Sequence, residues 1–233
     1  MLVYTPGKVG SSTIVNSLRK SGLPEIQPHS LSSSFPGVYF VYVKLSRYRN
    51  IFYIIKSWLL TLKACIYKII HKYRKLKMVV LIRSPGSRNI SAFFEHFHHL
   101  KKGEVSNYSP FELEELFYQH GYHDAQEVWL DRELKGVFGI DIYQLGAFKK
   151  GQPIIIQKKN IDLFFIRLED LKPNWNEFSK WLNCGSLDMR VTNRSQYKPY
   201  SQLYKKTKEL VLKNKEYAQS IEDTKFFRTF YKG

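Results

Sequence analysis

The sequence predicts an α/β protein in which a parallel β-sheet is flanked by helices in three layers. One sequence unit that occurs twice supports this fold class. In each copy a short apolar run, a polar turn containing glycine and a helical pattern follow one another, first at residues 2–20 and again at 78–100. Units of this kind build parallel sheets that are covered by helices on both faces. The 233 residues, 43% of them hydrophobic, can form one core, so we expect a single domain over residues 1–233.

The order of elements follows from periodicity and turn residues. Apolar runs of four to eight residues predict strands, and apolar residues spaced three and four apart predict helices. Glycine, proline and serine mark the breaks between them. The expected strands or extended segments are 2–5, 25–29, 38–44, 78–82, 153–157 and 163–167, and the expected helices are 11–20, 46–75, 87–100, 110–119, 124–135, 173–182 and 200–214.

Residues 51–70 form the only candidate for a membrane-spanning helix. They include Lys56, Lys63 and Lys68. Each lysine costs about 2.5–3.5 kcal/mol near the bilayer centre, so we do not expect a spanning helix. The basic helical segment 46–75 can instead pack on the domain or rest on a membrane surface.

Cysteine usage and the N-terminus favour the cytoplasm. Cys65 and Cys184 show no C-x-x-C spacing and are too few for a disulfide framework, so we expect no bridge between them. Met1 is followed by neither a basic n-region nor a long apolar stretch, so no signal peptide is expected. Contact with the inner face of the membrane through residues 46–75 remains an option for a cytoplasmic protein.

The chain is strongly basic. It contains 37 Lys and Arg residues against 20 Asp and Glu residues, a formal charge of +17 spread along the chain. Such a surface attracts anions, which include nucleotides, nucleic acids, acidic glycans and anionic lipids. Charge alone does not choose among these partners.

The segment Pro6-Gly7-Lys8-Val9-Gly10-Ser11-Ser12-Thr13 is a candidate phosphate-binding loop. Glycines let backbone N–H groups approach an anion, and the helix N-terminus adds partial positive charge. It is not a Walker A motif, because Lys8 precedes the second glycine of the loop. The alternative is an ordinary helix start with Ser11 or Ser12 as N-cap.

A second segment resembles a known family. Residues 79–94 form a strand that ends in Arg83-Ser84-Pro85, with Ser91 eight residues after the arginine. This pattern resembles the 3'-phosphate-binding segment of sulfotransferases that use 3'-phosphoadenosine 5'-phosphosulfate (PAPS). The loop at residues 6–12 resembles the 5'-phosphosulfate loop of the same family, and Arg167-Leu168-Glu169-Asp170-Leu171 is similar to its Arg-Tyr-Glu-Asp-Leu step.

A fourth stretch narrows the resemblance. Residues 129–134 and 139–143 are similar to bacterial proteins described as putative capsular polysaccharide synthesis proteins or carbohydrate sulfotransferases. The resemblance implies a P-loop NTPase-like sulfotransferase fold. It also implies PAPS as donor, the desulfated nucleotide PAP as product, no required metal, and a carbohydrate acceptor that can be anionic.

The resemblance assigns roles to individual residues. Lys8 would contact the sulfuryl group and the bridging oxygen that leaves with PAP, where a fixed cation stabilises developing charge. Amides of residues 10–13 and two serine hydroxyls would hold the 5'-phosphate, and Arg83 with Ser91 the 3'-phosphate. The cofactor-binding residues implied are Gly7, Lys8, Val9, Gly10, Ser11, Ser12, Thr13, Arg83 and Ser91.

The base that removes the acceptor's proton is less clearly marked. One branch of the family places a glutamate eight residues after the loop lysine, but Asn16 stands there. Another branch uses a histidine after the second strand, and His29 is the nearest match. Its ordinary pKa of about 6.5 suits a general base, although a histidine at a strand end can equally be a structural hydrogen-bonding residue.

Other polar groups allow more than one interpretation. His96, His98 and His99 lack the accompanying ligands of a metal site, so we expect no metal there. Glu169 and Asp170 are expected to shape the fold near the site, with Asp170 as an N-cap and Arg167 as an ion-pair partner. The basic residues Arg190, Arg194 and Lys198 either close over the nucleotide, contact an acidic glycan or form a solvated face. Arg88 either assists the 3'-phosphate or faces solvent.

The function expected from these patterns is sulfuryl transfer from PAPS to a hydroxyl of a polysaccharide, oligosaccharide or glycolipid by in-line displacement. A nucleotide-dependent kinase or phosphotransferase is one alternative, but it would need a lysine after the second loop glycine and an acidic residue to place Mg²⁺. A basic nucleic-acid-binding protein is the other. No nucleic-acid-binding signature is present, so no nucleic-acid partner is expected.

Overall fold

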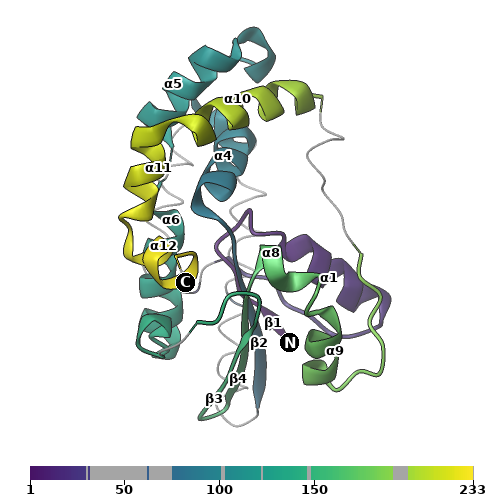
Figure 1. The fold of residues 1–233 in the computed structure, drawn as a ribbon. Helices are drawn as coiled ribbons and strands as arrows, with labels where there is room; N and C mark the ends of the chain where they lie inside the picture. Colours follow the sequence, from purple (N-terminus) through teal and green to yellow (C-terminus); the bar gives the residue numbers. More distant parts are fainter. Residues whose placement is uncertain are drawn as a thin grey trace.

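The part of the chain that the structure describes forms a four-stranded sheet with helices on both faces (Figure 1). This is a computed structural model, and it describes residues 1–29, 31, 62, 75–100, 103–121, 123–145, 148–190 and 199–232. The strand order is β1-β2-β4-β3, with β1, β2 and β4 parallel. The strands are β1 (Leu2–Val3), β2 (Leu76–Ile82), β3 (Ile154–Lys158) and β4 (Ile161–Arg167). The predicted α/β class with a helix-flanked sheet is therefore confirmed.

The expectation of a wholly parallel sheet is wrong at one edge. β3 runs antiparallel to β4, with Lys158 opposite Ile161 and Ile154 opposite Phe165. Only Lys159 and Asn160 connect the two strands, and Lys159 adopts a positive φ of 52°. A parallel pair needs a crossover of a dozen or more residues, whereas a two-residue connection permits only a hairpin.

The described helices mostly begin and end within two residues of their expected bounds. The expected helix over 124–135 is divided into α6 and a π-helical segment, Leu130–Lys135, and α11 and α12 had no counterpart in the expectation. The strand expected at 38–44 and nearly all of the helix expected at 46–75 lie outside the described residues. The helices are α1 (Ser11–Lys20), α4 (Pro85–His96), α5 (Pro110–His120), α6 (Ala125–Trp129), α7 (Gly136–Phe138), α8 (Leu168–Leu171), α9 (Trp175–Leu182), α10 (Ser201–Lys213), α11 (Lys215–Glu222) and α12 (Lys225–Phe230).

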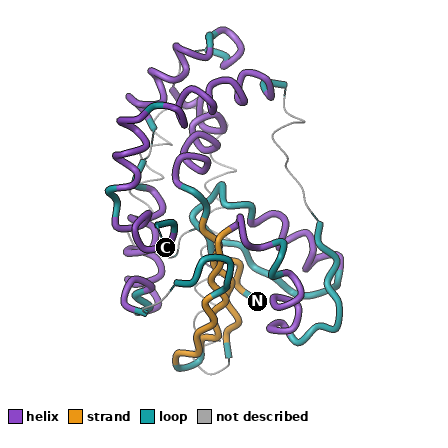
Figure 2. Tube along the Cα trace, viewed as in Figure 1, coloured by secondary structure: helices purple, strands orange, loops and turns teal. Residues whose placement is uncertain are grey.

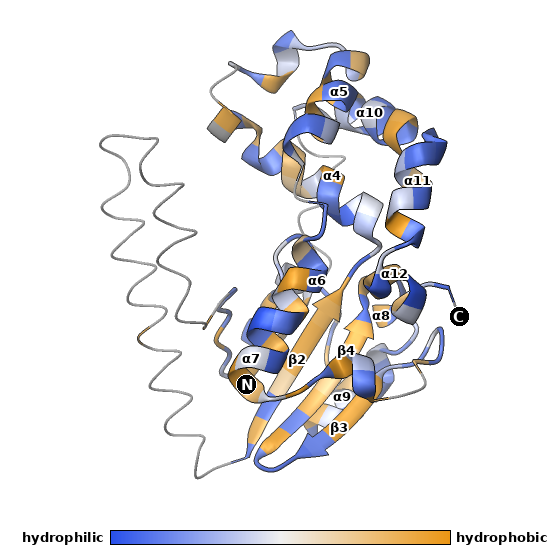
Figure 3. Ribbon diagram, turned by 90° about the vertical axis from the view of Figure 1, so that its left-hand side faces the viewer, coloured by the Kyte–Doolittle hydropathy of each residue, from blue (hydrophilic) through white to orange (hydrophobic). Residues whose placement is uncertain are grey.

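The central strands are buried on both faces. Met78 and Val80 of β2 pack toward residues of α6, the π-helical segment and α12, whereas Val79 and Leu81 pack toward α1 and α9. Figure 3 shows β2 and β4 as mostly hydrophobic along their length. Near-continuous apolar strands are typical of parallel sheets covered on both sides, so the alternation of side chains builds the three layers.

A second group of helices extends from the carboxyl ends of the strands. α4, α5, α10 and α11 share an aromatic core that includes Phe93, Phe117 and Tyr217. Figure 2 shows these helices together at one end of the molecule, and the arrows of β2 and β4 in Figure 3 point toward that end. In open α/β sheets, ligands bind at this edge.

The structure also bears on the expectations about the cysteines and about a membrane-spanning helix. Cys184 is a free thiol, and Cys65 lies outside the described residues. Within the described segments, no helix combines the length and apolar character needed to span a bilayer.

Candidate functional site

The loop between β1 and α1 has an unusual backbone. Gly7, Lys8 and Gly10 all have positive φ angles, of 33°, 63° and 78°. Gly10 is the N-cap of α1, and no side chain caps the helix. The alternative of an ordinary start with Ser11 or Ser12 as N-cap is therefore wrong, because Ser11 is already the first helical residue. Left-handed residues in succession turn consecutive N–H groups toward one concave side, as anion-binding loops do.

The loop presents backbone donors at the helix N-terminus. From Lys8 to Ser12, no backbone N–H donates to another residue that the structure describes. The Val9 side chain is fully buried in the core, so only its backbone faces the loop. Ser11 is buried and accepts a hydrogen bond from Gln27 Nε2 at 2.7 Å. Ser12 is half-buried, and Thr13 is buried. The loop thus offers unpaired amides and one accessible hydroxyl to an anion.

Arg83 follows directly after β2 and contacts the first loop. Its Nη1 donates to the Lys8 carbonyl at 3.3 Å. Its own peptide groups are held by Gln126, which accepts from the Arg83 N–H at 2.9 Å and donates to the Arg83 carbonyl at 2.7 Å. Gln126 is buried and comes from α6. Sequence analysis missed this residue, which fixes the backbone at the end of β2.

One face of α4 is turned toward the first loop. Arg88 Nε donates to the Gly7 carbonyl at 3.4 Å, and Glu95 pairs with Lys8 Nζ at 2.9 Å. Ser91 lies between them on α4, three residues after Arg88 and four before Glu95, which places all three on one helix face. Arg88 thus faces the loop. Ser91, which was expected to hold a 3'-phosphate together with Arg83, lies on the same face of α4.

Residues 167–171 also lie at the carboxyl ends of the strands, where β4 is followed by α8. A Cβ atom at Gly10 would lie 2.6 Å from Leu168 Cδ1, so α8 packs directly against the loop. Glu169 accepts a hydrogen bond from the Ser84 N–H at 2.9 Å, joining α8 to the turn after β2. The loop at residues 6–13, the turn at residues 83–85 and the segment 167–171 therefore meet at the carboxyl ends of three parallel strands.

The expected roles of the neighbouring ionic residues are partly corrected. Asp170 is not an N-cap: it lies inside α8, whose N-cap is Arg167. The expected ion pair between Arg167 and Asp170 is present. Arg167 is buried, donates to the Phe230 carbonyl at 3.0 Å and lies over the Tyr231 ring. The Arg167 guanidinium is therefore engaged by Asp170 and the Phe230 carbonyl and is not available to a ligand.

Lys208 on α10 adds a cation that sequence analysis did not identify. Burial lowers the pKa of Lys208, and repulsion from Arg83 lowers it further, while Glu169 acts in the opposite direction. Lys208 lies one helical turn before Leu212, which packs against Gly86, three residues after Arg83, so α10 brings Lys208 to this edge of the sheet. No local motif marks this lysine, because α10 reaches the site only through its packing on α4 and α5. Arg83 and Arg88 contact the loop that carries Lys8, and Lys208 approaches Arg83 closely enough to feel its charge, so this edge of the sheet is cationic.

His29 lies beside the start of the loop. Its side chain is exposed, and its Nδ1 lies 3.1 Å from the Thr5 carbonyl. A carbonyl only accepts, so Nδ1 carries the proton and Nε2 of the neutral ring is left as the acceptor nitrogen. Trp129 Nε1 donates to the His29 carbonyl at 2.7 Å. The buried Glu133 accepts from the Leu31 N–H at 2.8 Å, so the 129–133 stretch holds the His29 segment in place.

The remaining candidates contribute less. Asn16 lies on α1 and is half-buried. His96 and His98 are exposed, and the described residues contain no group of three or more His, Cys, Asp or Glu side chains that could hold a metal ion. Arg190 has an exposed side chain, and its N–H donates to Ser17 Oγ at 2.8 Å. Arg194 and Lys198 lie outside the described residues.

Comparisons of the chain with protein-family models, with curated proteins and with solved structures found no match.

Proposed function

We propose that this protein is a PAPS-dependent sulfotransferase that transfers a sulfuryl group to a hydroxyl of a carbohydrate, in a polysaccharide, oligosaccharide or glycolipid. The observation that carries the proposal is the contact between its two candidate phosphate-binding segments. Arg83 donates to the Lys8 carbonyl at 3.3 Å and Arg88 donates to the Gly7 carbonyl at 3.4 Å. A nucleotide with phosphates at both the 5' and 3' positions needs two anion sites of this kind side by side.

The residues present suit such a donor. The unpaired amides of residues 8–12 and the Ser12 hydroxyl would hold the 5'-phosphate at the N-terminus of α1. Arg83 and Ser91 would hold the 3'-phosphate, with Lys208 adding charge from α10. The proposal includes the P-loop NTPase-like sulfotransferase fold, because the loop lies between the first strand and the first helix.

In the proposed reaction, PAPS supplies the sulfuryl group and leaves as PAP. Lys8 is placed by its left-handed backbone at the mouth of the loop, where its ammonium would stabilise negative charge on the bridging oxygen. The acceptor oxygen attacks sulfur in line with the departing phosphate oxygen. The acceptor must also lose its proton, and the described residues offer two bases near the loop, His29 and Glu95.

Calorimetric titration with PAP tests this proposal. We expect micromolar binding by the wild type and much weaker binding of ATP and of AMP, which lack the 3'-phosphate. Arg83→Ala removes one charge-assisted contact, worth about 1.5–3 kcal/mol, so PAP affinity should fall by about 10-fold or more while AMP affinity changes little. Lys8→Ala should also weaken PAP binding.

Arg19→Ala is the matched control, because Arg19 is a largely exposed arginine paired with Glu25 away from the site. It should bind PAP like the wild type. A wild type without saturable PAP binding would overturn the proposal. Steeply salt-dependent binding of nucleic acid by such a protein would then favour a nucleic-acid-binding function.

A further inference from the structure

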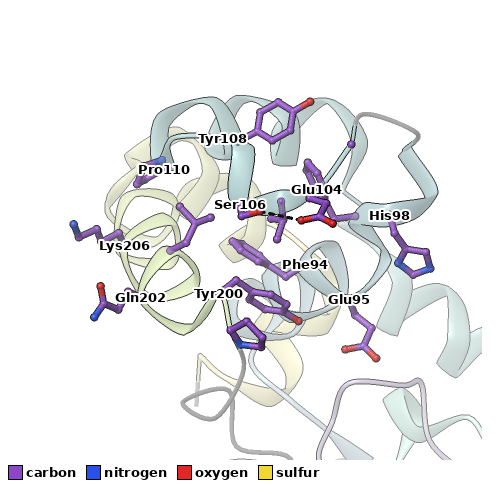
Figure 4. Close-up of a pocket in the computed structure, with 15 residues that line it drawn as sticks. Phe94, Glu95, His98, Glu104, Ser106, Tyr108, Pro110, Tyr200, Gln202 and Lys206 are labelled. Carbon is purple, nitrogen blue, oxygen red and sulfur yellow. Dashed lines mark hydrogen bonds between the residues drawn. The ribbon is translucent and has the colours of Figure 1, made fainter.

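A groove of about 830 Å³ opens between α4, α5 and α10 (Figure 4). Its lining includes the aromatic residues Phe94, Tyr108 and Tyr200. The rings of Phe94 and Tyr200 lie 5.5 Å apart, inclined by 34°. Its size falls in the range of about 300–1,000 Å³ typical of small-molecule sites. The groove is therefore large enough for a short oligosaccharide segment or a comparable ligand.

The lining combines ring surfaces with hydrogen-bonding groups. Glu95, Glu104, Ser106 and Gln202 line the groove together with its aromatic residues. A pyranose ring has matching chemistry, because its C–H faces pack on the electron-rich faces of aromatic rings and its hydroxyls donate to carboxylates and amides. The described lining residues include one lysine, Lys206, and no arginine, and the carboxylate of Glu95 is already paired with Lys8, so the groove offers no cluster of cations to hold an anionic sugar.

Glu95 belongs both to the groove and to the cationic site. Its carboxylate lines the groove, and its Oε1 lies 2.9 Å from Lys8 Nζ. Figure 4 shows the Glu95 side chain at one end of the groove, beyond Phe94 and Tyr200. A hydroxyl that reaches this end meets a carboxylate and, immediately beyond it, the lysine of the loop.

We infer that the groove is the acceptor site, that it takes an uncharged sugar segment, and that Glu95 is the catalytic base. This inference rests on the proposed function. Glu95 accepts the proton of the acceptor hydroxyl, and the hydroxyl oxygen forms a bond to sulfur. The bond between sulfur and the bridging oxygen breaks, and its electron pair stays on the phosphate of PAP, where Lys8 stabilises it.

Glu95 is better placed for this step than His29. The His29 ring does not line the groove, so its acceptor nitrogen Nε2 would not meet the hydroxyl of a sugar bound there. Its segment is further held by Trp129. Glu95, in contrast, is one residue from Phe94 on the same helix and touches the lysine directly. A general base must lie within hydrogen-bond reach of the proton that it removes, and among the described residues Glu95 both lines the groove and contacts Lys8.

The test uses an array of immobilised glycans that contains neutral hexose and N-acetylhexosamine oligosaccharides beside uronate- and sialate-containing ones. Fluorescently labelled protein reports binding, and ³⁵S-labelled PAPS reports transfer to the same spots. The variants are Glu95→Gln, Tyr200→Ala and His29→Gln. Glu115→Gln is the matched control, because Glu115 is an exposed carboxylate on α5 that hydrogen-bonds Gln119 and lies outside the groove lining.

We expect the wild type to bind and label neutral glycans. Glu95→Gln should bind them normally but transfer at least about 100-fold more slowly, and His29→Gln should lose much less transfer than Glu95→Gln, whereas the control Glu115→Gln should transfer at a near wild-type rate. Tyr200→Ala should lose about tenfold in glycan binding. Because Tyr200 packs on Phe94, this variant can fail to fold, so Gln202→Trp, at an exposed position of the lining, provides a second way to block the groove.

Four results would overturn the inference: binding restricted to anionic glycans, no binding to any neutral glycan, binding unaffected by Gln202→Trp, or transfer unaffected by Glu95→Gln. These differ from failure of the proposed function, which would appear as a wild type that binds no PAP in calorimetry whatever the array shows.

Discussion

Replacing Lys208 with alanine should weaken PAP binding without destabilising the ligand-free protein. Lys208 is half-buried beside Arg83, and burial and the neighbouring guanidinium both lower its pKa. Holding this ammonium in the ligand-free site is therefore unfavourable, and a bound phosphate relieves the repulsion. One charge-assisted contact contributes about 1.5–3 kcal/mol, so the Kd for PAP should rise by about 10- to 150-fold.

The titration of Lys208 should change protein stability and PAP affinity in opposite directions. Because its folded-state pKa lies below the ordinary value for lysine, the unfolded chain binds more protons between the two values, and stability rises with pH through that window. At neutral pH the charged Lys208 lowers stability, so Lys208→Ala should unfold at the same urea concentration as the wild type or a higher one. PAP affinity, in contrast, should fall as pH rises through the lowered pKa, since the neutral amine no longer attracts phosphate.

Calorimetry at pH 7 and at higher pH, together with urea unfolding, measures both effects. Lys205→Ala is the matched control, an exposed lysine on the same helix, and should change neither quantity. If Lys208→Ala bound PAP as tightly as the wild type, α10 would not contribute to the anion site. If it bound PAP weakly but also unfolded much earlier, the lysine would have a structural role and the reasoning from its pKa would be refuted.

Two further substitutions test the scaffold of the site by urea unfolding. Gly10→Ala forces a Cβ onto a residue with φ of 78° and into Leu168 Cδ1 at 2.6 Å, so we expect a loss of about 2–4 kcal/mol. Combining it with Leu168→Ala should cost less than the sum of the two changes, and simple additivity would show that the crowding is absent. Glu133→Ala leaves the Tyr4 hydroxyl and the Leu31 N–H without their acceptor and should cost about 2–4 kcal/mol, whereas Glu133→Gln, which keeps an acceptor oxygen, should cost less. A loss below about 1 kcal/mol for Glu133→Ala would contradict this role.

Local sequence information was sufficient for much of the fold. The apolar run of β2 and the serine-rich start and Ser-Gly end of α1 are encoded within a few residues, and α1 has the bounds that the pattern predicts. The antiparallel direction of β3 could also have been inferred, because the two residues between β3 and β4 are too few for a crossover. The end of the expected 124–135 helix was not predictable as a π-helical segment, because its side chains are arranged by their packing on the sheet.

Some features of the candidate site likewise follow from the sequence, whereas others follow only from the tertiary structure. By itself, the sequence determined which short segments place glycines and cations directly after a strand: the loop around Lys8 and the turn at Arg83. Only the tertiary structure decided that these segments touch, that Glu95 pairs with Lys8 beside an aromatic groove, and that Lys208 approaches Arg83 from a distant helix. The physical reason is that periodicity and turn chemistry act over a few residues, whereas the partner of a charged side chain is set by how whole helices pack against the end of the sheet.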